Sequence, residues 1–449
     1  MPPTLSVLRT PTTAPSSQDR YQVRRGSGLT PQVITGAQRL ADTGDMSAWA
    51  DLLDEIRQGD LHLHGDLQKR ELSVAGAPFE VHPPPGLASG NGRTQADRAV
   101  ALCRAALDAI VIPPGTLGVS FRGALAHLQT GLWHGRAALE VVWAREGRYL
   151  LPRELYPVHA RRLAWQAASW KLHIHDATTG GTRFATFPGV PCDDPEVFPP
   201  GKLLVHLPRV FGTYPTREGV GRGCVWFSAF KRWGVRDWLA FAEWAGRGLR
   251  VGKYASGRDP KSPARANDED VDALQEAIEA MSSTVATVIP DVTDLEILAA
   301  QDNDVHENLV KLCNAEMSKA ILGGTLTSDP GERGARSLGE VHLDAAQMLL
   351  ASDAEAIAEV IRRDLFTPVV RMNLGPRAPV PTLALNVAPP KNLDGFAQRI
   401  DRLVRAGLRV PAGWVRDTLG APDPVEGEEI LGPATTAPSS PPEPAQETP

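Results

Sequence analysis

Residues Arg222–Arg247, RGCVWFSAFKRWGVRDWLAFAEWAGR, decide the fold because aromatic side chains recur in this stretch at helical spacing. At 100° per residue, the apolar positions fall within an arc of roughly 140° on one side of a helix. The aromatic residues of this face and its edges are Trp226, Phe227, Phe230, Trp233, Trp238, Phe241 and Trp244. Asp237 projects into the arc, where a carboxylate needs a partner. The pattern predicts a long helix with a wide aromatic face.

A second helix of the same design is predicted over residues 304–322, after an excursion over residues 249–303. Its apolar face consists of Val305, Leu309, Leu312, Cys313, Met317 and Ala320. Within the excursion, helical spacing over residues 271–281 and a strand-like run over residues 284–289 outline a small α/β module. The two amphipathic helices therefore frame an insertion.

The composition of the 449 residues is that of an ordinary globular protein, with 42% hydrophobic and 22% charged residues. The net charge of −6 excludes a basic coat on nucleic acid. The four cysteines are widely scattered, which favours reduced core thiols over a metal knuckle. No window approaches the ~20 apolar residues of a membrane span, and nothing marks the chain for secretion.

The chain before the first long helix is predicted to be an α+β unit over residues 45–221. Residues 1–44 lack apolar periodicity and are predicted to form a disordered arm. Helical spacing then covers residues 46–57 and 61–70 and is followed by apolar–polar alternation from Leu72 to Val81. Six short strands, separated by Gly, Pro and Asp turns, are predicted between Ala137 and Leu207.

Beyond the second helix, residues 323–336 form a loop rich in Gly, Thr and Ser. Ser337 and Glu340 match a capping box that opens a helix reaching as far as Leu365, about 45 Å if unbroken. Pro368 is expected to stop this helix. Within residues 337–391 the chain is then predicted to return to the α+β unit. Residues 392–432 are predicted to be helical. The tail over residues 433–449 is predicted to be disordered.

Two patterns leave open the alternative of a metal- or nucleotide-dependent cytosolic enzyme. Gly219, Gly221 and Gly223 precede a helix, as in a phosphate cradle, but no Lys–Ser/Thr pair follows them. Histidines also come in pairs, as His62 with His64 and as His173 with His175. A strand would place the second pair on one face, but no third zinc ligand lies nearby in sequence. We therefore predict no catalytic residue, no metal site and no cofactor.

The loop over residues 323–336 joins two long helices and has Lys319, Arg333 and Arg336 in or near it. Such a loop can contact a phosphate backbone without reading sequence. A solvated surface loop explains the same composition equally well.

Several runs of this chain resemble the portal proteins of Mu-like tailed bacteriophages. The two longest are residues 198–254, which begin FPPGKLLVHLPRVFGTYPTREGVGRG, and residues 321–342, ILGGTLTSDPGERGARSLGEVH. DLQKRELSVAGAPFEVHPP from Asp66 and LGAPDPVEGEEIL from Leu419 fit the same pattern, so the resemblance covers roughly residues 45–431. The segment 247–250 departs from it, because a proline is expected there.

The resemblance implies a ring of about twelve copies at one capsid vertex, through which double-stranded DNA enters and leaves. It implies a wing over residues 45–221 and 337–391, stem helices over 222–248 and 304–322, a clip over 249–303, a tunnel loop over 323–336 and a crown over 392–432. The implied partners are the terminase large subunit, a head-tail adaptor, the major capsid and scaffold proteins and DNA, with no membrane. The implied location is the virion, and the host cytoplasm during assembly.

The resemblance also gives roles to particular residues. Candidates for the DNA tunnel are Lys319, Thr325, Thr327, Arg333 and Arg336. Candidates for packing between subunits are Trp226, Phe230, Trp233, Trp238, Phe241 and Trp244, because this aromatic face offers more apolar area than one monomer needs. A mildly acidic chain suits a conduit along which DNA must slide, since each fixed cation adds salt-dependent affinity.

Overall fold

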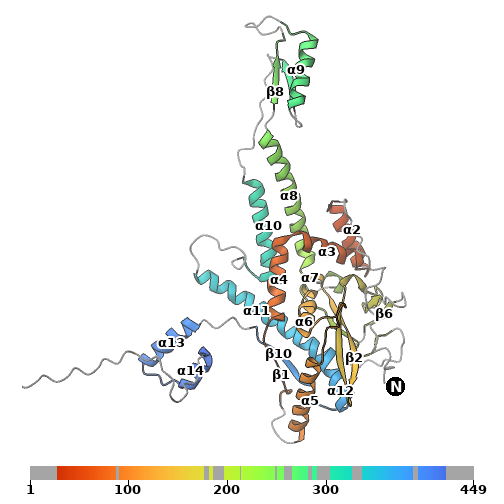
Figure 1. Ribbon diagram of the computed structural model, residues 1–449, viewed down its shortest axis with the longest axis vertical. Coiled ribbons are helices and arrows are strands. Elements are labelled where there is room, and N and C mark those ends of the chain that lie inside the picture. The colour runs from red at the N-terminus through yellow and green to blue at the C-terminus, as the bar shows by residue number, and fades with distance from the viewer. Residues whose placement is uncertain are drawn as a thin grey trace, which may run out of the picture. The chain divides into compact units, whose positions relative to one another are not determined.

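A computed structural model describes most of the chain (Figure 1). The described residues are 28–86, 91–175, 182–185, 197–212, 214–247, 250–256, 265–281, 286–290, 304–325, 336–387 and 393–420. The chain divides into two compact units at residue 387. Mixed helix and sheet in the first unit confirm the α+β prediction.

The described chain opens with three helices, α2 (Pro31–Asp42), α3 (Ser47–Gly59) and α4 (Leu61–Ala75). The prediction of a disordered arm up to residue 44 was wrong for residues 28–44. The Thr30 side chain caps α2, and Ile34 and Ala41 are fully buried against the neighbouring core. Three buried apolar residues at helical spacing are enough to stabilise a helix when a core lies beside it, although so few positions give only a weak periodicity in the sequence. Residues 1–27 lie outside the described part.

The predicted strand over residues 72–81 was wrong for most of its length. Helix α4 continues to Ala75, and only β1 (Phe79–His82) is a strand, paired antiparallel with β10 (Thr382–Leu385). Val74 is buried as part of a helical face that also contains Leu63 and Leu67. The apolar residues up to Ala75 therefore follow the 3.6-residue period of a helix, and over so short a stretch this resembled the two-residue period of a strand.

The main sheet has the order β3-β2-β7, built from β2 (Ala137–Glu146), β3 (Tyr149–Val158) and β7 (Leu203–His206). Helices α5 (Asn91–Asp108), α6 (Phe121–Gln129) and α7 (Gly131–His134) precede it. The first seven residues of β2 are buried. We call "sheet core" the buried apolar cluster that includes Leu139, Val141, Trp143, Ile357 and Phe366. A fully buried ion pair crosses this sheet, with Lys202 Nζ 2.7 Å from Glu140 Oε1.

A second sheet has the order β4-β5-β6 and contains β4 (Leu163–Trp165), β5 (Leu172–His175) and β6 (Thr182–Phe184). The short turns η2 (Ala160–Arg162) and η3 (Pro215–Arg217) lie before β4 and before α8. The six strands predicted between residues 137 and 207 are all present, although β3 is more than twice as long as expected because it pairs with β2 along its whole length.

The two long helices are α8 (Gly221–Arg247) and α10 (Val305–Leu322), which run side by side in Figure 1. Between them in sequence lies a module of β8 (Arg250–Tyr254), α9 (Asp268–Met281) and β9 (Ala286–Pro290), whose two strands pair in parallel. A helix connects the strands, as a parallel pair requires. Both the helix pair and the inserted module agree with the sequence prediction.

The helical backbone that begins with α11 (Arg336–Ile361) does not stop at Pro368, contrary to the prediction. It passes through a π-helical turn, η4 (Arg362–Phe366), into α12 (Thr367–Leu374). The wider turn lets the backbone continue past a proline at the start of α12, because that position needs no N–H donor. Two side chains of the π-turn also serve the edge strand β7, since Val205 N donates to Asp364 Oδ2 (2.9 Å) and Arg363 donates to Val205 O (2.6 Å).

The second unit contains α13 (Leu393–Arg405) and α14 (Ala412–Leu419), as predicted for residues 392–432. Gly407 follows α13 with a φ of 93°, the left-handed conformation expected of a glycine after a helix. Phe396 packs edge-on against Trp414. Among the described helices, none has the length and apolar character needed to cross a membrane.

Candidate functional site

Helices α8 and α10 form an antiparallel pair in which Leu309 of α10 packs over Gly234 of α8. A Cβ atom at Gly234 would lie 2.7 Å from Leu309 Cδ2, so a larger side chain there would require the leucine side chain to move. At the other end of α8, Cys224, Val225 and Ala229 are buried in the apolar cluster that also contains Trp49 and Trp133. The pair is thus anchored at its base.

The first polar connection to this base is Asp60, a residue 7% exposed that also caps α4 by accepting from Leu63 N (3.2 Å). Its carboxylate accepts from Lys231 Nζ at 2.7 Å and from Ser228 Oγ at 3.1 Å, both on α8. One buried carboxylate therefore fixes the start of α4 to α8.

The second connection is Asp66, which is 1% exposed. Ser318 Oγ of α10 donates to Asp66 Oδ2 at 2.6 Å, and the same hydroxyl lies 2.8 Å from His62 Nε2. Lys69 Nζ is 3.2 Å from the other carboxylate oxygen. This cluster fixes α4 to α10.

The third connection is Arg70, which is 6% exposed. Its guanidinium donates two hydrogen bonds to the Asp353 carboxylate of α11, at 2.7 and 3.0 Å, and a further one to the Ile321 carbonyl of α10. The fork geometry of arginine suits such bidentate contact. We call Asp60, Asp66, Arg70 and the partners just named the "α4 joint", because one helix holds α8, α10 and α11 through charged groups.

The predicted tunnel residues lie at the end of α10 and the start of α11. Lys319 is 54% exposed and pairs with Glu316 at 2.6 Å, so its charge is locally balanced. Thr325 is half-buried just after α10, and Arg336 opens α11. Thr327 and Arg333 lie outside the described residues. The structure therefore places the two described ends of the loop but not the loop itself.

The predicted aromatic face of α8 is partly exposed in the single subunit. Trp226, Phe230 and Trp233 form a row of ring contacts 5.7–6.1 Å between centroids, yet Phe230 is 41% exposed. Trp233 is fixed by a 2.7 Å hydrogen bond from its indole nitrogen to Leu29 O. The face that α8 buries at its base is instead lined by small residues, which helical spacing alone did not single out.

Further along α8, Trp238 stacks on His306 of α10 at 6.5 Å with the ring planes 7° apart, and it remains 38% exposed. Phe241 also contacts His306, at 6.2 Å. Asp237 does not enter an apolar region, because it is 59% exposed and pairs with Arg236 at 3.1 Å. The side chain of Trp244 is not described.

Three apolar residues are the most exposed in the described part of the helix pair, and of these the sequence analysis had named the two on α10 but not the one on α8. Leu239 on α8 is 64% exposed, and Val305 and Leu312 on α10 are 58% and 54% exposed. The predicted apolar face of α10 had treated the last two as packing residues. The exposure of these residues could have been inferred from the sequence, because the apolar face of each helix is wider than one partner helix can cover.

The glycine-rich approach to α8 is a packing device. A Cβ at Gly219 would lie 2.4 Å from Gly135 N, and one at Gly221 would lie 2.7 Å from Trp133 O. Since the backbone at the end of α7 lies against these two glycines, they serve the close packing of α7 and α8. His62 contacts Ser318, and His173 packs edge-on against Phe184. Among the described residues, no group of His, Cys, Asp or Glu side chains is arranged to hold a metal ion.

A polar cluster that the sequence did not reveal surrounds Asp54. Its carboxylate oxygens lie 3.0 Å from His134 Nε2 and 3.1 Å from His159 Nε2. Burial would raise the pKa of Asp54, but the hydrogen bonds from the two histidines outweigh it and hold that pKa well below its usual range. The neighbouring Arg136 is 1% exposed and donates to the carbonyls of Leu163, His134 and Ala160. These residues fix α3, α7 and η2 together.

Comparison with known proteins gives one family match. Residues 50–421 match the family described as the portal protein of Mu bacteriophage. The portal protein of Escherichia phage Mu is 27% identical over 421 residues, which is 92% of this chain and 75% of that protein. The Mu-like prophage FluMu protein gp29 of Haemophilus influenzae is also 27% identical, over 424 residues with the same coverage.

Solved structures give weaker likenesses. One is the neck of a native gene transfer agent particle computed with C12 symmetry, at 13% identity and a TM-score of 0.49, covering 87% of this chain and 94% of that one. Another is an HK97 family phage portal protein from Corynebacterium diphtheriae, at 13% identity and a TM-score of 0.40, covering 76% and 94%. Neither is close enough to carry an argument about this chain.

Proposed function

Because the chain belongs to the family of Mu bacteriophage portal proteins, we propose that it acts as a closed ring through which double-stranded DNA passes. The observation that carries this proposal is the family match over residues 50–421, which spans both long helices and the α4 joint. The family is structural and not enzymatic, so the alternative of a metal- or nucleotide-dependent enzyme is not supported.

The ring is proposed to have about twelve subunits, with α8 of one subunit against α10 of the next. A closed ring needs heterologous contacts, in which one patch meets a different patch of the neighbouring copy. The exposed apolar residues of the helix pair supply two such patches, with Phe230, Trp238 and Leu239 on α8 and with Val305 and Leu312 on α10. Packing between copies would remove them from water.

The DNA path is proposed to run past the loop between α10 and α11, with Lys319, Thr325, Thr327, Arg333 and Arg336 near the duplex. The pairing of Lys319 with Glu316 supports a sliding role, because a balanced charge adds little to phosphate affinity. Hydroxyl groups such as that of Thr325 can contact phosphates without fixing the duplex.

The partners are proposed from the same family role. The inserted module within residues 249–303 would dock the terminase large subunit during packaging and the head-tail adaptor afterwards. The region that contains the main sheet would meet the major capsid and scaffold proteins, and residues 392–432 would form the crown. The protein would then occupy one vertex of the virion, after assembly in the host cytoplasm.

Native mass spectrometry combined with negative-stain imaging tests the ring. We expect a closed assembly of about twelve copies with a central hole. A compact dimer, with no ring even after co-expression with the capsid and scaffold proteins, would contradict the proposal. Deletion of residues 325–334 tests the DNA path separately: rings should still form while packaging or DNA retention falls, whereas loss of rings would make the loop a subunit contact.

A further inference from the structure

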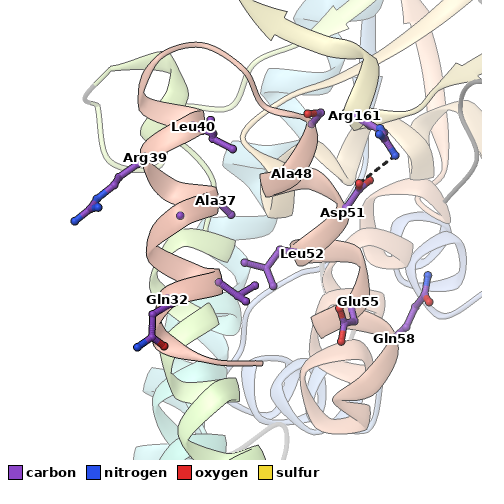
Figure 2. Close-up of a pocket in the computed structure, with 13 residues that line it drawn as sticks. Gln32, Ala37, Arg39, Leu40, Ala48, Asp51, Leu52, Glu55, Gln58 and Arg161 are labelled. Atoms are coloured by element: carbon purple, nitrogen blue, oxygen red, sulfur yellow. Dashed lines mark ion pairs between the residues drawn. The ribbon is translucent and has the colours of Figure 1, made fainter. Parts of the chain in front are cut away.

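A groove of about 650 Å³ lies between α2 and α3 (Figure 2). It is larger than the cavity of about 380 Å³ beside Asp54. Its size falls within the ~300–1,000 Å³ typical of binding sites. The floor is aliphatic, formed by Val33, Ala37, Leu40, Ala48 and Leu52. Leu40 is 47% exposed. The groove thus offers apolar surface to a ligand.

The charged residues of the groove balance one another. Arg161 pairs with Asp51 at 3.1 Å, as the dashed line in Figure 2 shows, and Glu55 pairs with Arg232 of α8 at 3.3 Å. Arg39 is the remaining charged residue that lines it. With its two carboxylates already paired, the groove has no strong attraction for a polyvalent ion. Apolar side chains are the chemistry that it fits.

Gly36 makes the groove accessible to a polypeptide backbone. No heavy atom lies within 4 Å of the position that its Cβ would occupy, so the surface of α2 is open there. Glycine in the interior of a helix is less favourable than alanine. A close approach of another chain at this point would explain why the helix contains it.

We propose that the N-terminal segment Leu5–Leu8 of this chain occupies the groove. Its sequence, Leu-Ser-Val-Leu, is an apolar run within residues 1–27, which otherwise contain mostly proline, polar residues and four arginines. Those residues join the groove's own helix, because the described chain begins at Gly28, three residues before α2. Leu29 is 6% exposed and its carbonyl is held by Trp233, so the attachment point is fixed.

The length of the connection allows this contact. Nineteen residues lie between Leu8 and Gly28, and a chain of that length can reach at most about 65 Å. Helix α2, with 12 residues, is only about 18 Å long. The segment can therefore reach the groove of its own subunit or that of an adjacent copy. The inference does not depend on the proposed ring.

A binding measurement on the full chain tests the proposal. The receptor carries Leu5→Asp and Leu8→Asp, which should empty the groove, and a fluorescent peptide of residues 1–20 is titrated into it. Gly36→Leu in the same receptor should weaken binding at least tenfold, because the new side chain fills the groove while favouring the helix. The matched control is Gly65→Leu on α4, a helical glycine with equally open surroundings, which should leave binding unchanged. No binding, or equal loss in both variants, would overturn the proposal.

Disulfide cross-linking gives a second readout. In a Cys192→Ser background, Leu8→Cys with Leu40→Cys should cross-link at least five times more than Leu8→Cys with Leu72→Cys, since Leu40 and Leu72 are similarly exposed (47% and 52%) and Leu72 lies outside the helix pair. The described native cysteines, Cys103, Cys224 and Cys313, are buried and do not compete. A cross-linked monomer or a cross-linked dimer would each support the proposal and identify the copy that donates the segment. Equal yields from the two pairs would contradict it.

Discussion

The sheet core and the α4 joint are both buried, but one is held by apolar contact and the other by charged side chains. The core around Trp143 and Phe366 contains aliphatic and aromatic residues from β2, α5, α6 and α11. In the joint, each charged residue contacts a different helix: Asp60 bonds to α8, Asp66 to α10 and Arg70 to α11. Apolar packing tolerates small shifts, whereas hydrogen-bonded charges define one position. Apolar contact therefore supplies most of the stability of the sheet core, whereas the charged groups of the α4 joint set where α4 lies against its neighbours.

The largest effect should come from the sheet core. Phe366 is fully buried, so Phe366→Ala should lower the free energy of unfolding by about 4 kcal/mol through lost transfer energy and the cavity left behind. Urea unfolding followed by circular dichroism measures this. Met348→Ala on α11, where the side chain is 73% exposed, is the control and should change stability by less than about 0.5 kcal/mol.

In the α4 joint, Lys231→Met should cost about 3 kcal/mol, because it leaves the Asp60 carboxylate buried without its cation. The double variant Lys231→Met with Asp60→Asn should recover most of this loss, since asparagine still caps α4 and carries no charge. The same urea titration compares the two. If the double variant were as unstable as the single one, the joint would be held by packing and not by charge.

Acid should weaken the region of the main sheet through two histidines. Burial lowers the pKa of His127 and of His206 to about 4, so the folded protein keeps both neutral while the unfolded chain binds protons below about 6.5. Stability should therefore fall as pH drops from 6.5 towards 4, by about 1.4 kcal/mol per pH unit for each histidine. His206→Gln should remove its share of that slope in urea titrations at pH 6.5, 5.5 and 4.5.

A charge placed on the exposed face of α8 should have the smallest effect on the stability of the monomer and the largest effect on ring assembly. Leu239→Asp changes a side chain that is 64% exposed, so unfolding should shift by less than about 0.5 kcal/mol. If α8 packs against a neighbouring copy, the buried charge should nevertheless prevent rings in native mass spectrometry. Leu117→Asp, at a residue 63% exposed outside the helix pair, should allow them. Normal rings from Leu239→Asp would remove this face from the interface.

Helical periodicity was enough to predict α8, α10 and the inserted module, because long amphipathic helices carry their pattern over many turns. It failed where the pattern was short. α2 has few apolar positions, and the end of α4 resembled a strand over a handful of residues. The continuation through Pro368 was not predictable from local spacing, because the side chains of the π-turn bond to a strand far away in sequence: Arg363 donates to Val205 O, and Asp364 accepts from Val205 N.

The sequence by itself determined the class of fold, the paired helices with their insertion and the family to which the chain belongs, since each rests on patterns local in the chain or on long runs of similar residues. Only the tertiary structure decided which face of α8 is buried and how α4 holds its neighbours. Asp60 meets Lys231 across 171 residues, and Asp66 meets Ser318 across 252. No spacing rule links positions so far apart, because their contact exists only once the helices have packed.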